Sequence, residues 1–144
     1  MRELRILFTG VGRRVELIQA FRQAALRLSA ALKIYGADLN GTAPALAYCD
    51  FTRKVCGMKE AGYIHELVKI CDKDKIDLLI PTIDTDLLTL SENISAFSHT
   101  RVMISASEKI RLCRDKNKTS QFFVDCGLLA PMPVNRLEDY KTGY

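Results

Sequence analysis

Short, nearly continuous apolar runs alternate along this chain with longer segments of helical periodicity. The clearest run is IDLLIPT at 76–82, which is apolar at almost every position, as expected of a central parallel strand covered on both faces. The periodic segments repeat apolar side chains every three or four residues, which is typical of amphipathic helices. This alternation predicts an α/β fold, because parallel strands must be joined by helical crossovers.

The same patterns place the individual elements. We expect strands at 4–9, 32–38, 53–57, 76–82 and 101–105. We expect helices at 13–29, 61–75, 84–98, 106–115 and 116–129, and at most one helical turn in the loop 41–50. Asp84 is a plausible N-terminal cap, Pro44 suits a first helical position, and Gly127 suits a helix end. The order predicts a Rossmann-like, doubly wound parallel sheet of about five strands, in the order 3-2-1-4-5, with helices on both faces.

The loop TGVGRR at 9–14 lies between the first strand and the first helix. Gly10 and Gly12 allow a tight turn, and their backbone N–H groups could approach an anion at the start of the helix. Arg13 and Arg14 add positive charge that could clamp an acidic group. The loop therefore either turns the chain without binding anything or binds a phosphate or a carboxylate.

A dinucleotide site is a third interpretation of the same loop. Such a site needs another glycine where Val15 stands, so the fingerprint is incomplete. Asp38, at the end of the second strand, is positioned to bind a ribose hydroxyl. A dinucleotide-binding Rossmann module consequently remains the alternative function.

Two carboxylates follow the fourth strand in PTIDTD at 81–86. Loops at the carboxyl ends of neighbouring parallel strands meet at the crevice where open α/β sheets bind ligands. Asp84 and Asp86 could hold a cation or a substrate amine there. They could equally cap the next helix and interact with the positive end of its dipole.

A basic cluster lies around the start of the last predicted helix. Its members are Arg111, Arg114, Lys116 and Lys118. Asp115 can cap the helix, which leaves Lys116 in the first turn, where the helix dipole slightly disfavours a cation. That conflict points to an anionic ligand, with a solvated helix face as the alternative.

Composition excludes several classes of protein. The formal net charge of +4 is too small to indicate a nucleic-acid partner, and no apolar run approaches the ~20 residues of a membrane span. The five cysteines form no C-x-x-C pair and only two histidines accompany them, so we expect no metal site. Buried free thiols in a reducing compartment are the simplest interpretation, and we expect a cytoplasmic protein.

The stretch RDKNKTSQFFVDCGLLAPMP at 114–133 resembles the signature that opens the ATP-grasp domain. Asp115, Lys116, Phe122, Gly127 and either Pro131 or Pro133 occupy its positions. PTIDTDLLTLSENISAF at 81–97 is similar to a segment of biotin carboxylase and its relatives. ILFTGVGRRVELIQAF at 6–21 resembles the opening of carbamoyl-phosphate-synthase-like ATP-grasp proteins.

The resemblance implies a domain organisation and a reaction. Residues 1–113 would be a pre-ATP-grasp α/β domain, and 114–144 a linker helix with the truncated beginning of an ATP-grasp domain. In this family ATP phosphorylates a carboxylate or bicarbonate, and an amine or another nucleophile then attacks the acyl phosphate. We therefore expect the front part of a longer ATP-dependent ligase, incomplete and inactive as a chain of 144 residues.

The resemblance also assigns roles to residues. Lys116 would contact ATP phosphate, while Gly10, Gly12 and Arg13 would lie on the substrate side of the cleft. ATP and Mg²⁺ would act in the full-length protein, with neither held tightly by this fragment, which supplies no catalytic residue and no metal ligand. The expected partner is a small acidic substrate, with homodimerisation possible. A non-enzymatic assembly domain is a further alternative.

Overall fold

The computed structural model describes residues 3–131 and 134. The chain forms two compact units, residues 1–106 and 107–144. Pro133, one of the positions matched to the ATP-grasp signature, lies outside the described residues, as does the segment 135–144. The domain boundary at 113/114 therefore stays a prediction.

The first unit contains one sheet. Its strands are β1 (Leu4–Thr9), β2 (Leu32–Asp38), β3 (Phe51–Lys54), β4 (Leu78–Pro81) and β5 (Arg101–Val102). All four pairings are parallel and the order is β3-β2-β1-β4-β5. The predicted fold class and strand order are confirmed.

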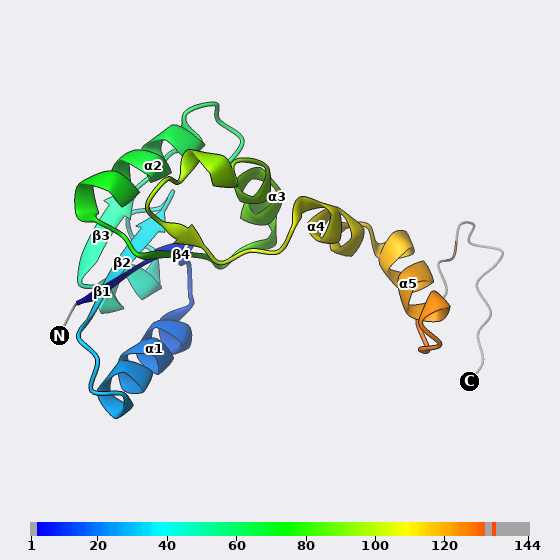
Figure 1. The fold of residues 1–144 in the computed structure, drawn as a ribbon, viewed down its shortest axis with the longest axis horizontal. Helices are drawn as coiled ribbons and strands as arrows, with labels where there is room; N and C mark the ends of the chain where they lie inside the picture. The colour runs from blue at the N-terminus through cyan, green and yellow to red at the C-terminus, as the bar shows by residue number, and fades with distance from the viewer. Residues whose placement is uncertain (1–2, 132–133, 135–144) are drawn as a thin grey trace. The chain divides into compact units, whose positions relative to one another are not determined.

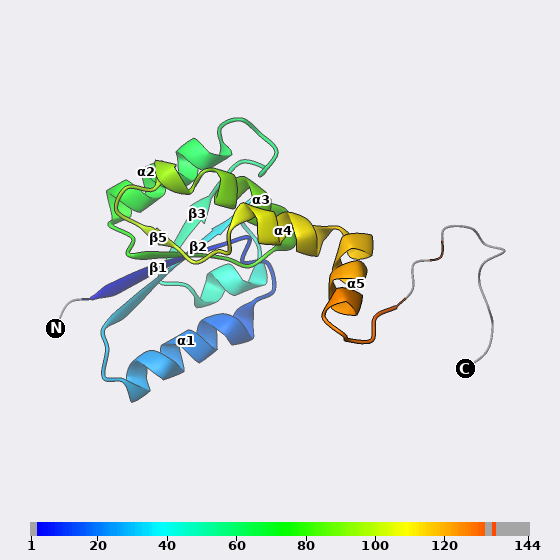
Figure 2. The same ribbon diagram turned by 45° about the vertical axis from the view of Figure 1, so that its right-hand side comes forward.

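Helices cover both faces of this sheet, as Figures 1 and 2 show. They are α1 (Val15–Arg27), α2 (Tyr63–Asp74) and α3 (Asp84–Glu92), with short 3₁₀ turns η1 (Pro44–Tyr48) and η2 (Ile94–Ala96). Helix α1 and η1 pack on one face of the sheet, while α2 and α3 pack on the other. This is the doubly wound arrangement, in which each strand must be apolar on both sides.

Alternation along the strands divides the core between the two faces. Ile6, Phe8, Ile34 and Ile80 pack toward Ile18 of α1. Leu7, Tyr35 and Leu79 pack toward Leu67 of α2 and Leu90 of α3. Because successive strand side chains point to opposite faces, one short apolar strand contributes to both core layers.

Several predicted boundaries were wrong. The third strand lies at 51–54 and not at 53–57, and β5 is only two residues long. The helix predicted at 84–98 ends at Glu92, because the Asn93 side chain donates to the Thr89 carbonyl and occupies an acceptor at the helix end. Asp84 is the first helical residue and not the cap, which is Ile83 in extended backbone.

The second unit contains α4 (Ser107–Arg114) and α5 (Lys116–Asp125). Asp115 caps α5 as predicted, because its Oδ1 accepts from the N–H groups of Asn117 and Lys118 at 3.1 and 3.2 Å. Gly127, at φ +75°, closes the helix in the left-handed conformation that favours glycine. Of the five cysteines, Cys71 is buried, Cys49 and Cys56 are half-buried, and Cys113 and Cys126 are exposed, so the expectation that the cysteines are mostly buried was wrong. None of the helices in the described ranges is long and apolar enough to cross a membrane.

Candidate functional site at the carboxyl edge of the sheet

The loops after β1 and β4 are joined directly, as the doubly wound order predicts. The Thr82 N–H donates to the Thr9 carbonyl at 3.1 Å, and the Thr82 hydroxyl donates to the Gly10 carbonyl at 2.7 Å. These bonds hold the glycine loop against the start of α3. The carboxyl edge of the sheet is therefore one continuous surface formed by segments about 70 residues apart.

Both glycines of the loop are required by backbone geometry. Gly10 and Gly12 have φ angles of +60° and +45°, a region that other residues rarely adopt. A Cβ on Gly10 would lie 2.7 Å from Cδ1 of Ile83. The tight turn alone thus accounts for these two residues, and their predicted contact with substrate stays a prediction.

Asp38 occupies the loop amide that an anion would need. Its Oδ2 accepts from the Gly12 N–H at 2.8 Å, and its Oδ1 accepts from the Asn40 N–H at 2.9 Å. A dinucleotide site would use the first of these amides for phosphate and the carboxylate for ribose. The internal pairing removes both contacts, so the structure gives the dinucleotide alternative no support.

The arginines of the loop remain accessible at this edge. Arg13 and Arg14 are both exposed, and the Arg14 guanidinium donates to the Thr82 carbonyl at 3.4 Å. That contact extends the positive charge of the loop toward the start of α3. An acidic ligand at this edge would consequently meet solvated guanidinium groups.

Asp86 lies in the core, although the sequence suggested an exposed ligand or cap. Its side chain is 0 % exposed, and its Oδ2 accepts from the Thr9 hydroxyl at 2.7 Å and the Tyr63 hydroxyl at 2.8 Å. Its Oδ1 has no hydrogen-bond partner within the described part of the chain. Burial raises the pKa of Asp86 above its ordinary value, although both hydroxyl bonds act in the opposite direction.

This arrangement connects three elements around the edge. Thr9 ends β1, Tyr63 begins α2, and Asp86 lies in the first turn of α3, whereas Asp84 in the same turn is exposed. Thr9 and Tyr63 were missed by sequence reasoning, since a threonine in a strand and a tyrosine in a helix carry no local signal of a polar contact. Asp84 is the acidic residue of this pair that solvent can reach, and its predicted ligand role stays a prediction.

A pocket of about 190 Å³ opens at this edge beside the glycine loop. We call it the edge pocket, and it is lined by Gly10, Gly12, Asp38, Leu39, Val55, Cys56, Gly57, Met58, Tyr63 and Ile83. The residues come from the ends of β1 and β2, the β3–α2 connection, the start of α2, and the β4–α3 loop. Ligands of open α/β sheets bind at this edge.

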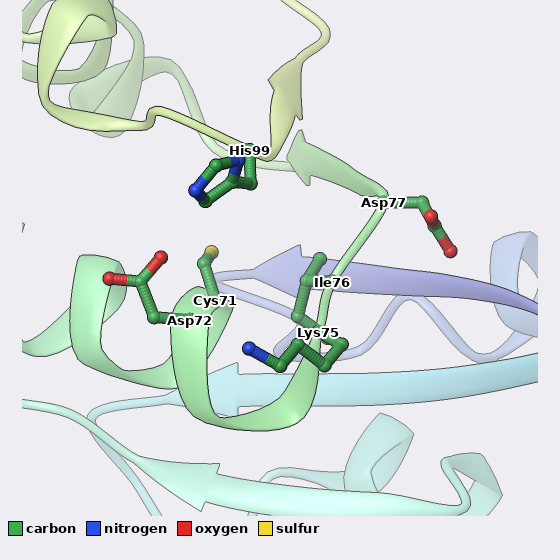
Figure 3. Close-up of a pocket in the computed structure, with 6 residues that line it drawn as sticks. All are labelled: Cys71, Asp72, Lys75, Ile76, Asp77 and His99. Carbon is green, nitrogen blue, oxygen red and sulfur yellow. The ribbon is translucent and has the colours of Figure 1, made fainter.

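A second cavity, of about 150 Å³, lies at the opposite, amino-terminal edge of the sheet. Figure 3 shows the sulfur of Cys71 directed toward the imidazole of His99, with Asp77 pointing away from the other lining residues. Burial raises the pKa of the Cys71 thiol to about 11, which keeps it protonated and unreactive at neutral pH. No metal-binding group of three or more His, Cys, Asp or Glu side chains occurs in the described ranges.

Lys116 is the exposed first residue of α5. The N–H groups of Asn117 and Lys118 already donate to the Asp115 carboxylate. An anion near the start of this helix would therefore interact with the Lys116 amine and not with those two N–H groups. The neighbouring Lys118 amine lies 3.8 Å from the Asp115 carboxylate, while Lys116 has no such contact in the structure as described. Its chemistry is therefore that of a solvated cation open to a ligand.

Residues 6–105 match the family described as PylC-like, N-terminal domain. The chain belongs to this family. The match begins within β1, continues past β5 and includes every residue of the edge pocket. No curated protein sequence matches the chain.

Solved structures share the fold of this PylC-like domain at low identity. An L-amino acid ligase from Bacillus licheniformis has a TM-score of 0.65 at 15% identity, over 100% of this chain and 35% of its own. Glycinamide-RNase-transformylase T from Mycobacterium tuberculosis has a TM-score of 0.61 at 17% identity, over 85% of this chain and 35% of its own. N5-carboxyaminoimidazole synthetase from Staphylococcus aureus, complexed with ADP, has a TM-score of 0.61 at 13% identity, over 88% of this chain and 31% of its own.

These comparisons bear on the resemblance drawn from the sequence. The family match confirms the expected N-terminal domain, and the solved structures share its α/β fold. The chain spans about a third of the length of the three proteins compared with it.

Proposed function

We propose that this PylC-like domain is the N-terminal part of an ATP-dependent ligase that joins a carboxylate to an amine through an acyl phosphate. In the first step a carboxylate oxygen attacks the γ-phosphorus of ATP, and the bond to the β-phosphate oxygen breaks to release ADP. In the second step the amine attacks the carbonyl carbon, phosphate leaves with its electron pair, and the amine loses a proton.

The observation that carries the proposal is Lys116 at the start of a side-chain-capped helix. Lys116 is exposed and stands where the ATP-grasp signature, which residues 114–133 resemble, has its phosphate-contacting lysine, and no described partner neutralises it. A positive charge fixed at this point stabilises the negative charge that develops during phosphoryl transfer. ATP would supply the phosphoryl group, and Mg²⁺ would be held by residues other than those of this chain.

The carboxyl edge of the first unit would hold the substrate. Arg13 and Arg14 provide exposed positive charge, and the Thr9–Asp86–Tyr63 contacts keep the loops beside them fixed. This favours a small acidic molecule as the substrate. The 144-residue chain would bind substrate at this edge and would not carry out the reaction alone.

The test uses the polypeptide in which this sequence is followed by an ATP-grasp core. ADP release is measured with carboxylate and amine substrates, and hydroxylamine is added to trap an acyl phosphate as a hydroxamate. We expect both signals to require ATP and a carboxylate. Lys116→Ala should reduce kcat/KM by about 10²–10³, the effect of removing one charge-stabilising group.

Lys109→Ala provides a matched control, because Lys109 is an exposed lysine on α4 in the same unit. It should leave the rate unchanged. Absence of ATP-dependent hydroxamate, or equal rates in the two variants, would contradict the ligase assignment and the role of Lys116 respectively. A saturable melting shift with NAD(H) or NADP(H) would instead support the dinucleotide alternative.

A further inference from the structure

Four apolar side chains form much of the wall of the edge pocket. Leu39 follows β2, Val55 and Met58 follow β3, and Ile83 precedes α3. These four side chains come from three different loops, so the pocket exists only in the folded chain. Its volume of about 190 Å³ is similar to cavities that accept benzene.

The polar groups that line the pocket are already paired within the chain. The Asp38 carboxylate accepts from the N–H groups of Gly12 and Asn40. The Tyr63 hydroxyl donates to the buried Asp86 carboxylate at 2.8 Å. A polar ligand group placed in the pocket would lose its hydration without gaining an unoccupied partner, which is unfavourable.

The backbone N–H of Cys56, another lining residue, is also paired within the chain. Its N–H donates to Oε2 of Glu66 at 2.8 Å, and its thiol is half-buried. Desolvation, and then the Glu66 carboxylate, raises the pKa of the Cys56 thiol above its ordinary value. The sulfur therefore contributes a neutral, weakly polar surface to the pocket.

Positive charge lies next to this apolar wall. Arg13 follows the lining residue Gly12, and the Arg14 guanidinium contacts the carbonyl of Thr82, the residue before Ile83. A ligand with an apolar group and a carboxylate a few bonds away would place the first in the pocket and the second at the arginines. Acids of this kind include α-amino acids with branched aliphatic or aromatic side chains.

We propose that the edge pocket selects the apolar side chain of an amino-acid substrate, with the substrate carboxylate facing Arg13 and Arg14. The inference rests on the proposed function only in calling this ligand a substrate. Binding of the ligand requires neither ATP nor any residue outside this chain. It narrows the expected acidic molecule to one with an apolar side chain that a pocket of about 190 Å³ can receive.

The experiment is a titration of the 144-residue chain, labelled with ¹³C at methyl groups, followed by NMR. The probes are L-leucine, glycine and L-glutamate. L-leucine should shift the methyl signals of Val55, Met58 and Ile83 saturably. Glycine should bind at least about tenfold more weakly, because it has no apolar side chain to bury in the pocket.

Two variants distinguish the pocket from other surfaces. Met58→Trp fills the cavity from its partly exposed rim and should abolish the leucine-dependent shifts. Leu26→Trp enlarges a side chain that is 80 % exposed on α1 and should leave leucine binding unchanged. Unchanged binding in Met58→Trp, with its fold confirmed by the remaining methyl spectrum, would overturn the assignment of the pocket.

The carboxylate contact is tested with the double variant Arg13→Gln, Arg14→Gln. It should weaken the binding of L-leucine by about twofold to fivefold, as expected for exposed ion pairs, and leave the binding of 3-methylbutan-1-ol unchanged. Equal effects on both probes would overturn the role of the arginines. No saturable shift with L-leucine, or tighter binding of L-glutamate, would overturn the whole proposal.

The outcome is separate from that of the ligase assignment. If L-leucine binds the edge pocket but the longer polypeptide forms no acyl phosphate, the proposed reaction fails while the site stands. If ATP-dependent ligation occurs but L-leucine does not bind, the pocket assignment fails and the reaction stands.

Discussion

The Thr9 hydroxyl donates to Oδ2 of Asp86 over 2.7 Å in the interior of the protein, and the two residues are 77 positions apart. Thr9 is the last residue of β1 and immediately precedes Gly10, so this bond fixes the point where the glycine loop leaves the sheet. Tyr63 reaches the same carboxylate oxygen and also lines the edge pocket. Asp86 therefore holds the loop and one pocket wall in a common position.

Neutralising Asp86 should change how stability depends on pH. Burial raises its pKa in the folded state above the ordinary value of 3.8, so folding disfavours the ionised form. The stability that this group contributes is complete below about pH 3.8 and is lost as pH rises through the folded-state pKa. Asp86→Asn should accordingly be more stable than wild type at pH 7, with the difference shrinking toward about pH 4.

Urea unfolding of both proteins at a series of pH values measures this difference, and other titrating groups cancel in the comparison. Asp72→Asn removes the same charge from an exposed position and should show no such trend. A difference between Asp86→Asn and wild type that does not vary with pH would contradict the expectation.

Removing the hydroxyl of Thr9 should destabilise the first unit. Thr9→Val keeps the shape of a fully buried side chain but leaves Asp86 with one donor. We expect a loss of about 1–3 kcal/mol, the usual result of depriving a buried polar group of a hydrogen bond. Thr52→Val, at an exposed position of β3, should change the unfolding free energy by less than about 0.5 kcal/mol. Similar losses in both variants would argue against the buried contact.

Substituting Gly10 should damage the carboxyl edge more than substituting another loop glycine. Gly10→Ala combines a φ of +60° with a Cβ 2.7 Å from Ile83, and should cost about 1–3 kcal/mol. Gly41→Ala, which meets nothing within 4 Å, should be neutral or stabilising by up to about 1 kcal/mol. Thermal unfolding of the two variants gives the comparison. Adding Ile83→Ala to Gly10→Ala tests how much of the loss comes from the steric contact.

Asp115 and Lys116 should separate into a structural and a ligand-binding residue. Asp115→Ala removes the acceptor of two backbone N–H groups and should destabilise α5 by about 1 kcal/mol. Lys116→Ala should preserve the helix, because alanine has the higher helix propensity. Hydrogen exchange at the amides of Asn117 and Lys118 reports the difference. Faster exchange in Lys116→Ala than in Asp115→Ala would reverse the two roles.

The periodicity of the sequence by itself determined the parallel sheet, the strand order and the position of most helices. Those features follow from local chemistry: side-chain alternation, the right-handed crossover rule, and the Asp115 cap with Gly127. Element ends were predicted less well, because side-chain bonds such as Asn93 to the Thr89 carbonyl end a helix without changing its apolar pattern. The glycine loop and PTIDTD were correctly expected to meet, since both follow neighbouring strands.

Only the tertiary structure decided what the residues at that edge do. Asp38 pairs with the Gly12 amide across 26 positions, and Asp86 is buried against hydroxyls from two other elements. Neither partner can be inferred from spacing along the chain, because each contact depends on the packing of separate loops. The edge pocket also forms where three loops pack together. Because these loops are far apart in the sequence, the pocket could be located only once the fold was known.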